Sequence, residues 1–176
     1  MRILALTQRV PHQPDRGDRI RSHHLLKRLG ARHELWLGCL SDERIPRDAR
    51  KILDTFCQRN EVVRIGSARR LLQSAEALLT RQPLSLAWYQ HPRLMETLRS
   101  WQKEVRFDAA YVFCSSMAPY WLDLARRESL PAVMDFIDVD SLKWSQYAAA
   151  SSGPKAWIYR RERNLLGEWE AEVARA

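Results

Sequence analysis

Three carboxylates lie close together in the segment DFIDVDSLKW, where Asp135 belongs to an apolar run and Asp138 and Asp140 follow it. Carboxylates at the end of a buried strand can orient a sugar hydroxyl, act as a general base or hold a metal ion. If the strand continued, Asp138 and Asp140 would project on the same side, because side chains alternate along a strand. The alternative is a solvated loop in which one aspartate caps a helix beginning near Ser141. The spacing alone does not decide between these interpretations.

The loop at residues 8–17 is the second candidate, because it ends in a glycine just before a predicted helix. Gly17 would let the backbone approach a ligand, and the free N–H groups of a helix starting at Asp18 would face an anion. A turn glycine followed by a capping aspartate is the structural alternative. No G-x-G-x-x-G fingerprint is present, so the sequence does not support binding of NAD or FAD. His23 and His24 are adjacent and face different sides of a helix, which makes them a poor metal pair.

Aromatic residues are the third candidate, because seven tryptophans is a high number for 176 residues. Trp101, Trp121 and Trp169 occupy helical positions that suit packing in a core. Trp88 and Tyr89 fall between two predicted helices. Exposed aromatics near arginines suit sugar stacking or contact with a membrane interface, whereas a loop that folds back would bury them. Both possibilities stay open for this pair.

The chain carries 29 Lys and Arg against 21 Asp and Glu, a formal charge of +8. A basic balance attracts anions such as nucleic acid, anionic lipid or phosphorylated substrates. The arginines are spread over several predicted helices, however, and this is typical of solvated helix faces. The three cysteines show no metal-ligand spacing, and Cys39 and Cys114, which lie in apolar strand-like runs, read as buried free thiols; this favours the reducing cytoplasm. No apolar run is long enough to span a membrane, and the first residues read as a strand rather than a signal peptide.

Short apolar segments alternate with longer helical patterns along the chain. Strands are predicted at residues 2–7, 34–40, 62–65, 109–114 and 132–137, and helices at 18–29, 46–57, 67–80, 92–104, 117–128, 141–149 and 156–175. Residues 81–91 read as irregular. This order predicts an α/β fold of one domain, a Rossmann-like parallel sheet with helices on both faces. Ligands bind such sheets at the carboxyl ends of the strands, which directs attention to loops 8–18, 115–116 and 138–141. Because the sequence ends within a predicted helix, we expect residues 1–176 to be the N-terminal domain of a longer enzyme.

Four segments together carry a family resemblance: VPHQPDRGDRIRSHHLLKRLGARHELWLGCLSD, QPLSLAWYQ, VFCSSMAPY and DFIDVDSLKWSQYA. They resemble the N-terminal half of bacterial sugar transferases of exopolysaccharide biosynthesis, within glycosyltransferase family 4. The resemblance implies one half of a GT-B architecture, with this chain as the acceptor-side domain and a donor-binding domain, carrying an E-x7-E motif, elsewhere. It implies a retaining transfer from a nucleotide-sugar without metal or other cofactor. The implied acceptor is an oligosaccharide or a polyprenyl-diphosphate-linked sugar, at the inner face of the cytoplasmic membrane.

The resemblance also assigns expected roles to residues. Gly17, where many relatives have two glycines, corresponds to the loop that approaches the donor phosphates, together with the N–H groups of Asp18 and Arg19. Asp138 falls near the position of a catalytic-loop histidine in many relatives. We therefore expect Asp138 and Asp140 to position or polarise the acceptor hydroxyl or the sugar. The remaining expected binding residues are Arg21, which would pair with a phosphate or a neighbouring carboxylate, and Ser115, Ser116, Ser141 and Lys143.

Two alternatives come from other functional classes. The first is a stand-alone basic module that binds nucleic acid or another polyanion; the net charge favours it, but no nucleic-acid-binding motif is present and the arginines are not gathered on one helix. We therefore do not expect nucleic acid as a partner. The second is a small-molecule hydrolase using the aspartate cluster, which lacks a G-x-S-x-G nucleophile elbow.

Overall fold

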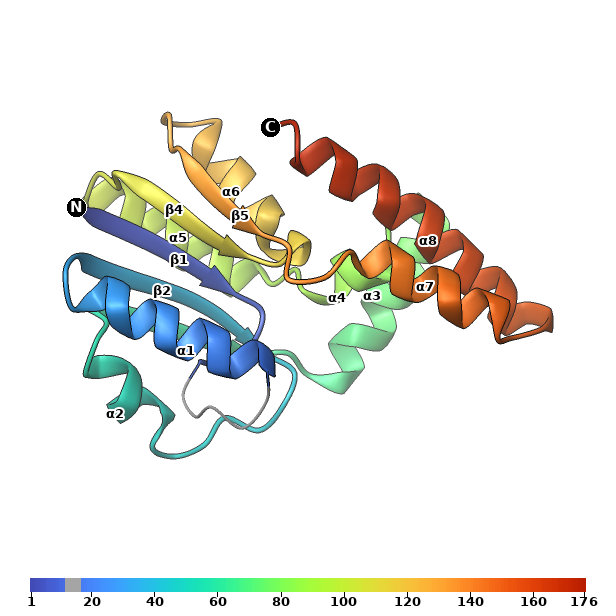
Figure 1. The fold of residues 1–176 in the computed structure, drawn as a ribbon, viewed down its shortest axis with the longest axis horizontal. Helices are drawn as coiled ribbons and strands as arrows, with labels where there is room; N and C mark the ends of the chain where they lie inside the picture. The colour runs from blue at the N-terminus through green and yellow to red at the C-terminus, as the bar shows by residue number, and fades with distance from the viewer. Residues whose placement is uncertain (12–16) are drawn as a thin grey trace.

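The computed structural model describes residues 1–11 and 17–176, and the described residues form an α/β fold around a parallel sheet (Figure 1). The sheet has five strands in the order β3-β2-β1-β4-β5, and every neighbouring pair is parallel. The predicted fold class is therefore confirmed. The strands are β1 (Arg2–Thr7), β2 (Glu34–Ser41), β3 (Arg59–Arg64), β4 (Ala109–Phe113) and β5 (Ala132–Asp135).

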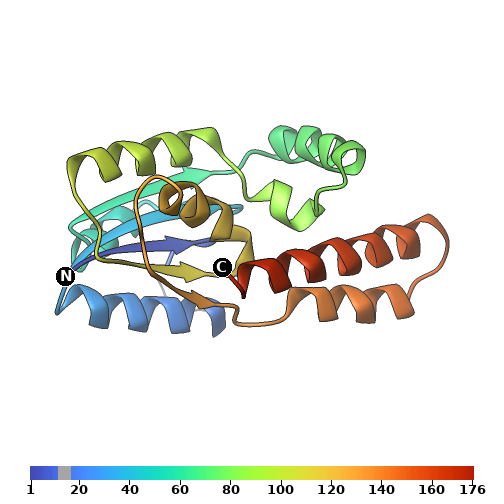
Figure 2. The same ribbon diagram turned by 90° about the horizontal axis from the view of Figure 1, so that it is seen from above.

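Helices cover both faces of the sheet, as Figure 2 shows when the sheet is seen edge-on. One face packs against α1 and α2, and the other against α5 and α6. The helices are α1 (Gly17–Gly30), α2 (Ala49–Asp54), α3 (Ser67–Thr80), α4 (Leu84–Trp88), α5 (Pro92–Glu104), the 3-10 turn η1 (Ser115–Met117), α6 (Ala118–Ala125), α7 (Asp140–Ala149) and α8 (Gly153–Val173).

The central strands are apolar on both sides because both sides are buried. In β1, Leu4 and Leu6 join the core under α5 and α6, whereas Ile3 and Ala5 join the core under α1 and α2. Gly38 of β2 lets α5 approach closely, since a Cβ there would lie within 3.3 Å of three leucine side chains. The sheet is thus a rigid frame for the loops at its ends.

The strand order places a topological switch point between β1 and β4. From β1 the chain passes to β2 and β3 on one side, and later to β4 and β5 on the other. Loops after β1 and β4 therefore diverge and leave a crevice at the carboxyl edge. Beyond that edge, α7 and α8 form a helical hairpin and α3 and α4 form a second small layer (Figures 1 and 2).

Four details differ from the sequence predictions. The segment predicted as irregular contains α4, which forms because Glu162 of α8 accepts hydrogen bonds from its first N–H groups. β5 ends at Asp135, two residues earlier than predicted. The helix predicted at residues 117–128 is the shorter α6, which ends at Ala125 and directly follows the 3-10 turn η1. Among the described residues α1 begins at Gly17, so Asp18 lies inside the helix. In the part of the chain described, no helix is long and apolar enough to cross a membrane.

Candidate functional site

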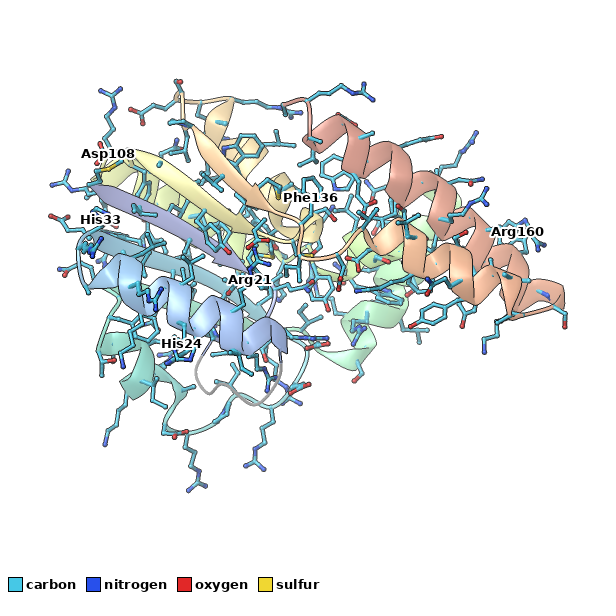
Figure 3. All side chains as sticks on the ribbon, in the orientation of Figure 1. Arg21, His24, His33, Asp108, Phe136 and Arg160 are labelled. Atoms are coloured by element: carbon cyan, nitrogen blue, oxygen red, sulfur yellow. The ribbon has the colours of Figure 1, made fainter. Side chains whose placement is uncertain are left out.

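A cavity of about 410 Å³ lies at the carboxyl edge of the sheet, where the switch point predicts a ligand site. Segments following four of the five strands contribute to it, together with α3, α4 and α7. Figure 3 places Phe136, one of its lining residues, at this edge, whereas His33 and Asp108 lie at the opposite edge. The lining residues are Gln8, Arg9, Asp42, Arg70, Ser85, Trp88, Tyr89, Cys114, Phe136, Ile137, Asp138, Asp140, Lys143, Trp144 and Tyr147.

Two residues of the cavity wall have a strained backbone. Cys114, directly after β4, has φ 80°, and Ile137, two residues after β5, has φ 64°. Side chains of L-residues disfavour positive φ, and a β-branched isoleucine disfavours it most. Strain of this kind costs about 1–3 kcal/mol and concentrates at functional sites, where surrounding structure enforces it. Both strained turns direct the chain around the same cavity.

Asp135 holds the loop after β5 in its strained shape. Its Oδ2 accepts a hydrogen bond from the Tyr111 hydroxyl at 2.7 Å and pairs with Arg21 Nη2 at 2.9 Å. Its Oδ1 accepts the N–H of Ile137 at 3.2 Å. Burial and the hydrogen bond to Asp135 raise the pKa of Tyr111, so this phenol stays a donor. The first carboxylate of the cluster is therefore structural.

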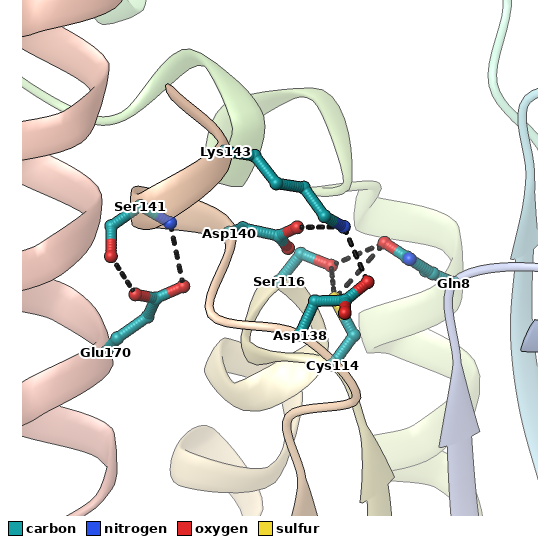
Figure 4. A network of polar contacts seen from close by, with 8 residues as sticks. All are labelled: Gln8, Cys114, Ser116, Asp138, Asp140, Ser141, Lys143 and Glu170. Atoms are coloured by element: carbon teal, nitrogen blue, oxygen red, sulfur yellow. Dashed lines mark hydrogen bonds and ion pairs between the residues drawn. The ribbon is translucent and has the colours of Figure 1, made fainter. Parts of the chain in front are cut away.

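Asp138 and Asp140 converge on one cation at the mouth of the cavity (Figure 4). Lys143 Nζ lies 2.7 Å from Asp138 Oδ2 and 3.1 Å from Asp140 Oδ1. Partial burial alone would lower the pKa of Lys143, but the hydrogen bonds and charges of the two aspartates outweigh it and raise that pKa. The predicted alternation along a continued strand is wrong, because β5 ends before Asp138; a turn and the first residues of α7 bring the pair together instead. Neither aspartate caps α7; the N-cap residue is Val139, and the N–H of Ser141 donates to the Glu170 carboxylate of α8 at 3.4 Å.

The floor of the cavity is a compact polar contact. Gln8 Oε1 accepts hydrogen bonds from Cys114 Sγ at 3.3 Å and from Ser116 Oγ at 3.1 Å (Figure 4). The loops after β1 and β4 are thus joined across the switch point. Burial raises the pKa of Cys114, so its thiol is neutral. All three cysteines are buried and free, which confirms the prediction made for Cys39 and Cys114.

Two pairs of aromatic residues form parts of the cavity wall. Trp88 and Tyr89 come from α4 and its end, and Trp144 and Tyr147 come from α7. The guanidinium of Arg70 lies 4.8 Å from the centroid of the Trp88 ring. Burial, together with the charge of Asp42, raises the pKa of Tyr89 to about 12. The two possibilities for Trp88 and Tyr89 are thus reconciled, because the segment folds back and still presents both residues to a cavity.

Helix α8 anchors both walls through buried glutamates. Glu162 is fully buried and accepts hydrogen bonds from the N–H of Leu84 at 2.7 Å and of Ser85 at 3.1 Å. Glu170 accepts the Ser141 hydroxyl at 2.6 Å, and Trp169 Nε1 donates to the Ser115 carbonyl at 3.0 Å. Glu162 fixes α4, and the other two contacts fix the start of α7 and the turn after β4.

The predicted site residues therefore fall into separate groups. Asp138, Asp140 and Lys143 line the cavity together. Ser116 lies beneath the cavity and donates a hydrogen bond to Gln8. The buried Ser115 and Ser141 form hydrogen bonds to side chains of α8 instead.

The residues predicted on α1 are not among the described lining residues. Gly17 is exposed at the start of the helix, and the buried Arg19 pairs with Glu43 at 2.6 Å. Arg21 pairs with Asp135, as the carboxylate alternative predicted. The side chain of Asp18 and residues 12–16 of the first loop lie outside the described residues.

Sequence reasoning did not name Gln8, Arg70 and Tyr147 as site residues. Gln8 begins the loop 8–18, to which the rule that ligands bind at strand ends had directed attention. Arg70 and Tyr147 carry no such signal, because their place depends on how α3 and α7 fold over the edge.

The arrangement suits a polyhydroxylated ligand that carries negative charge. Carboxylates accept hydrogen bonds from sugar hydroxyls, aromatic faces stack on sugar rings, and Arg9 and Arg70 add positive charge. No group of three His, Cys, Asp or Glu side chains that could hold a metal ion occurs among the described residues. A comparison of the sequence with protein-family models and with curated proteins found no match.

Proposed function

We propose that this chain is the acceptor-side domain of a retaining glycosyltransferase of exopolysaccharide biosynthesis. It would receive a sugar acceptor, oligosaccharide or polyprenyl-diphosphate-linked, in the cavity at the carboxyl edge. The nucleotide-sugar donor would be held mainly by a second domain, so the chain alone would not catalyse transfer. The support is the sequence resemblance together with one structural observation, namely a cavity at the topological switch point that combines paired aspartates with two aromatic walls.

The chemistry asked of the cavity is positioning and polarisation. A nucleophilic hydroxyl must be oriented toward the anomeric carbon of the donor sugar, and a carboxylate that accepts its hydrogen bond increases its nucleophilicity. Asp138 is the better placed carboxylate, because its side chain is 57% exposed whereas that of Asp140 is 32% exposed. Lys143 keeps both aspartates in place through its two ion pairs. Arg70, beside Trp88, would bind a diphosphate.

Tryptophan indoles provide a direct test. In an NMR titration of the ¹⁵N-labelled chain with a water-soluble prenyl-diphosphate-linked monosaccharide, we expect the indole resonances of Trp88 and Trp144 to shift. Trp36 of β2 packs against Trp101 of α5 in the core, with ring centroids 5.2 Å apart, and the two serve as internal controls. Unshifted resonances for Trp88 and Trp144 at millimolar ligand would overturn the proposal, and so would equal shifts of all four.

The polyanion-binding alternative has less support. Many arginines are paired with carboxylates of neighbouring elements, among them Arg2 with Glu34, Arg99 with Asp123, and Arg106 with Glu128. Paired arginines spread over the surface offer little to a nucleic-acid backbone, which is bound by clustered positive charge.

A further inference from the structure

Helix α3 presents its apolar side to solvent. Leu71, Leu72, Leu78 and Leu79 are exposed by 73%, 72%, 41% and 86%, and together they form a surface that we call the leucine stripe. Helices of globular proteins normally turn such a stripe toward the core. Scattered exposed leucines are ordinary, but four on one 14-residue helix make a contiguous patch that indicates an interaction site.

The orientation of α3 is fixed by its polar side, which faces the protein. Gln73 Nε2 donates to the Gln90 carbonyl at 2.7 Å, and Trp88 Nε1 donates to Ser74 Oγ at 2.7 Å. Ala77 is fully buried between these contacts. Turning the leucine stripe inward would break these hydrogen bonds and bury polar groups without partners, which is unfavourable. The stripe therefore faces outward because the rest of the helix is anchored.

Charge around the stripe indicates what covers it. From Arg64 to Arg81 the sequence holds four arginines and a single acidic residue, Glu76. Arg81 directly follows α3, and Arg64 ends β3 three residues before the helix begins; both are exposed. Leucines on one side of a helix with arginines at its borders are typical of helices that lie in the interface of a bilayer, where the arginines contact lipid phosphates. We propose that α3 docks this protein on an anionic lipid surface through the leucine stripe.

A second copy of the chain is a poorer occupant. An exposed arginine lies shortly before α3 and another directly after it. Pairing two stripes in either direction therefore brings arginines of one copy near arginines of the other, and like charges at an interface oppose association. A single convex helix also needs a groove in a rigid partner, whereas fluid lipid adapts to it. The proposed occupant is therefore the bilayer itself.

The docked helix would place the candidate site beside the lipid. Arg70 and Trp88 both line the cavity. Arg70 belongs to α3, and Trp88 contacts the inner side of that helix. Figure 2 shows α3 as an outer layer beyond the carboxyl edge of the sheet. A polyprenyl-linked acceptor could then enter the cavity while its lipid stays in the bilayer. This entry of the acceptor from the bilayer rests on the proposed function, whereas the docking of α3 does not.

Vesicle co-sedimentation of the purified chain tests the docking. The probes are vesicles of phosphatidylcholine alone and vesicles with about one-third phosphatidylglycerol. We expect binding to the anionic vesicles, a reduction of at least about tenfold in the double variant L71S/L79S, and a smaller reduction in Arg81→Asn. The matched control is I20S/V133S, which removes two exposed apolar residues on α1 and β5 and should bind like the wild type. Circular dichroism checks that all variants are folded.

A single labelled cysteine adds an independent measurement. Leu72→Cys carrying bimane should show a blue-shifted emission with anionic vesicles, because the label enters the acyl boundary; the native cysteines are buried. Failure of the wild type to bind anionic vesicles, equal loss in I20S/V133S, or dimerisation abolished by L71S/L79S would each overturn the proposal. None of these results bears on ligand shifts of Trp88 and Trp144, so failure of the docking and failure of the proposed function are distinguishable.

Discussion

The two edges of the sheet each carry a cavity, and the larger one is not the candidate site. A cavity of about 510 Å³ lies at the amino edge, between the ends of α1 and α2, and the cavity at the carboxyl edge measures about 410 Å³. The amino-edge cavity is lined by turns that close the fold. Glu34 N–H donates to the Met1 carbonyl at 3.0 Å, and Gln58 N–H donates to the Leu35 carbonyl at 2.8 Å. Its polar groups are thus engaged in connecting elements.

The difference between the edges lies in convergence and strain rather than volume. At the carboxyl edge, loops from separate strands bring Asp138, Asp140 and Lys143 to one point, and two non-glycine residues with positive φ shape the wall. The residues lining the amino edge include none of the three non-glycine positive-φ residues found in the described chain. Open parallel sheets bind ligands outside the carboxyl ends of their strands, at the switch point where neighbouring loops diverge.

The largest expected effect is a loss of turnover that occurs on substitution at the carboxyl edge and not at the amino edge. In the enzyme completed by its donor-binding domain, Asp138→Asn should lower the turnover of sugar transfer by about 10²–10⁴-fold, because the amide no longer accepts a proton or polarises a hydroxyl. Asp54→Asn is the matched control at the amino edge, where Asp54 Oδ1 accepts a hydrogen bond from Asn60 at 2.7 Å. Initial rates with a labelled nucleotide-sugar measure both variants. Unchanged turnover in Asp138→Asn would remove this residue from the site.

The second effect is on the frame of the carboxyl-edge cavity. Glu162→Ala should lower the free energy of unfolding by about 4 kcal/mol, since it leaves two N–H groups of α4 and the guanidinium of Arg161 without their carboxylate. Urea denaturation measures the change. The exposed Glu168, on the same helix, gives the control Glu168→Ala, for which we expect a change within about 0.5 kcal/mol. Similar losses in both variants would show that α8 does not anchor α4 through Glu162.

The third effect compares a glycine at each edge. A Cβ on Gly30 would lie 2.0 Å from the Phe56 carbonyl oxygen, so Gly30→Ala should cost about 2 kcal/mol as α1 and α2 move apart. Nothing lies within 4 Å of a Cβ on Gly17, and Gly17→Ala should stabilise the helix by about 0.5 kcal/mol. Thermal or urea unfolding measures both. A larger loss in Gly17→Ala than in Gly30→Ala would contradict the packing role assigned to the amino edge.

The frame of the molecule could be predicted from the sequence, because it depends on local patterns. Apolar runs such as residues 34–40 are long and flanked by turn residues, and the alternation with helices indicates parallel strands. The fold class and the carboxyl edge as the place of the cavity followed from that order. The prediction of irregular structure for the segment that contains α4 was wrong, because this helix has only five residues and depends on a carboxylate of α8 that is distant in sequence.

Residues of the candidate site could be predicted from the sequence only where they directly follow a strand. Asp138, Asp140 and Lys143 follow β5 directly, and they were placed together in one loop from the sequence. Arg19 and Arg21 also follow a strand, yet their carboxylate partners, Glu43 and Asp135, come from other loops. Side chains that look available to a ligand in sequence are often engaged once distant loops meet. The leucine stripe was missed because residues 67–80 suit a helix whichever side faces the core.

The smallest effect concerns the ion pairs at the mouth of the cavity. Lys143 is 46% exposed, so solvent screens its pairs with Asp138 and Asp140, and Lys143→Gln should lower the free energy of unfolding by less than about 1 kcal/mol near pH 8. The pKa of Lys143 is raised in the fold, hence the stabilisation is complete below the unfolded pKa of about 10.4 and is lost as the pH rises through the folded value. The difference in urea stability between wild type and Lys143→Gln should therefore stay the same from pH 8 to about pH 10 and shrink as the pH rises further. In an Asp138→Asn background the same substitution should cost less, because one of the two partners has lost its charge. A difference that stays constant above about pH 10 would mean that Lys143 stabilises the loop by packing rather than by charge, and that the aspartates at the carboxyl edge are held by other contacts.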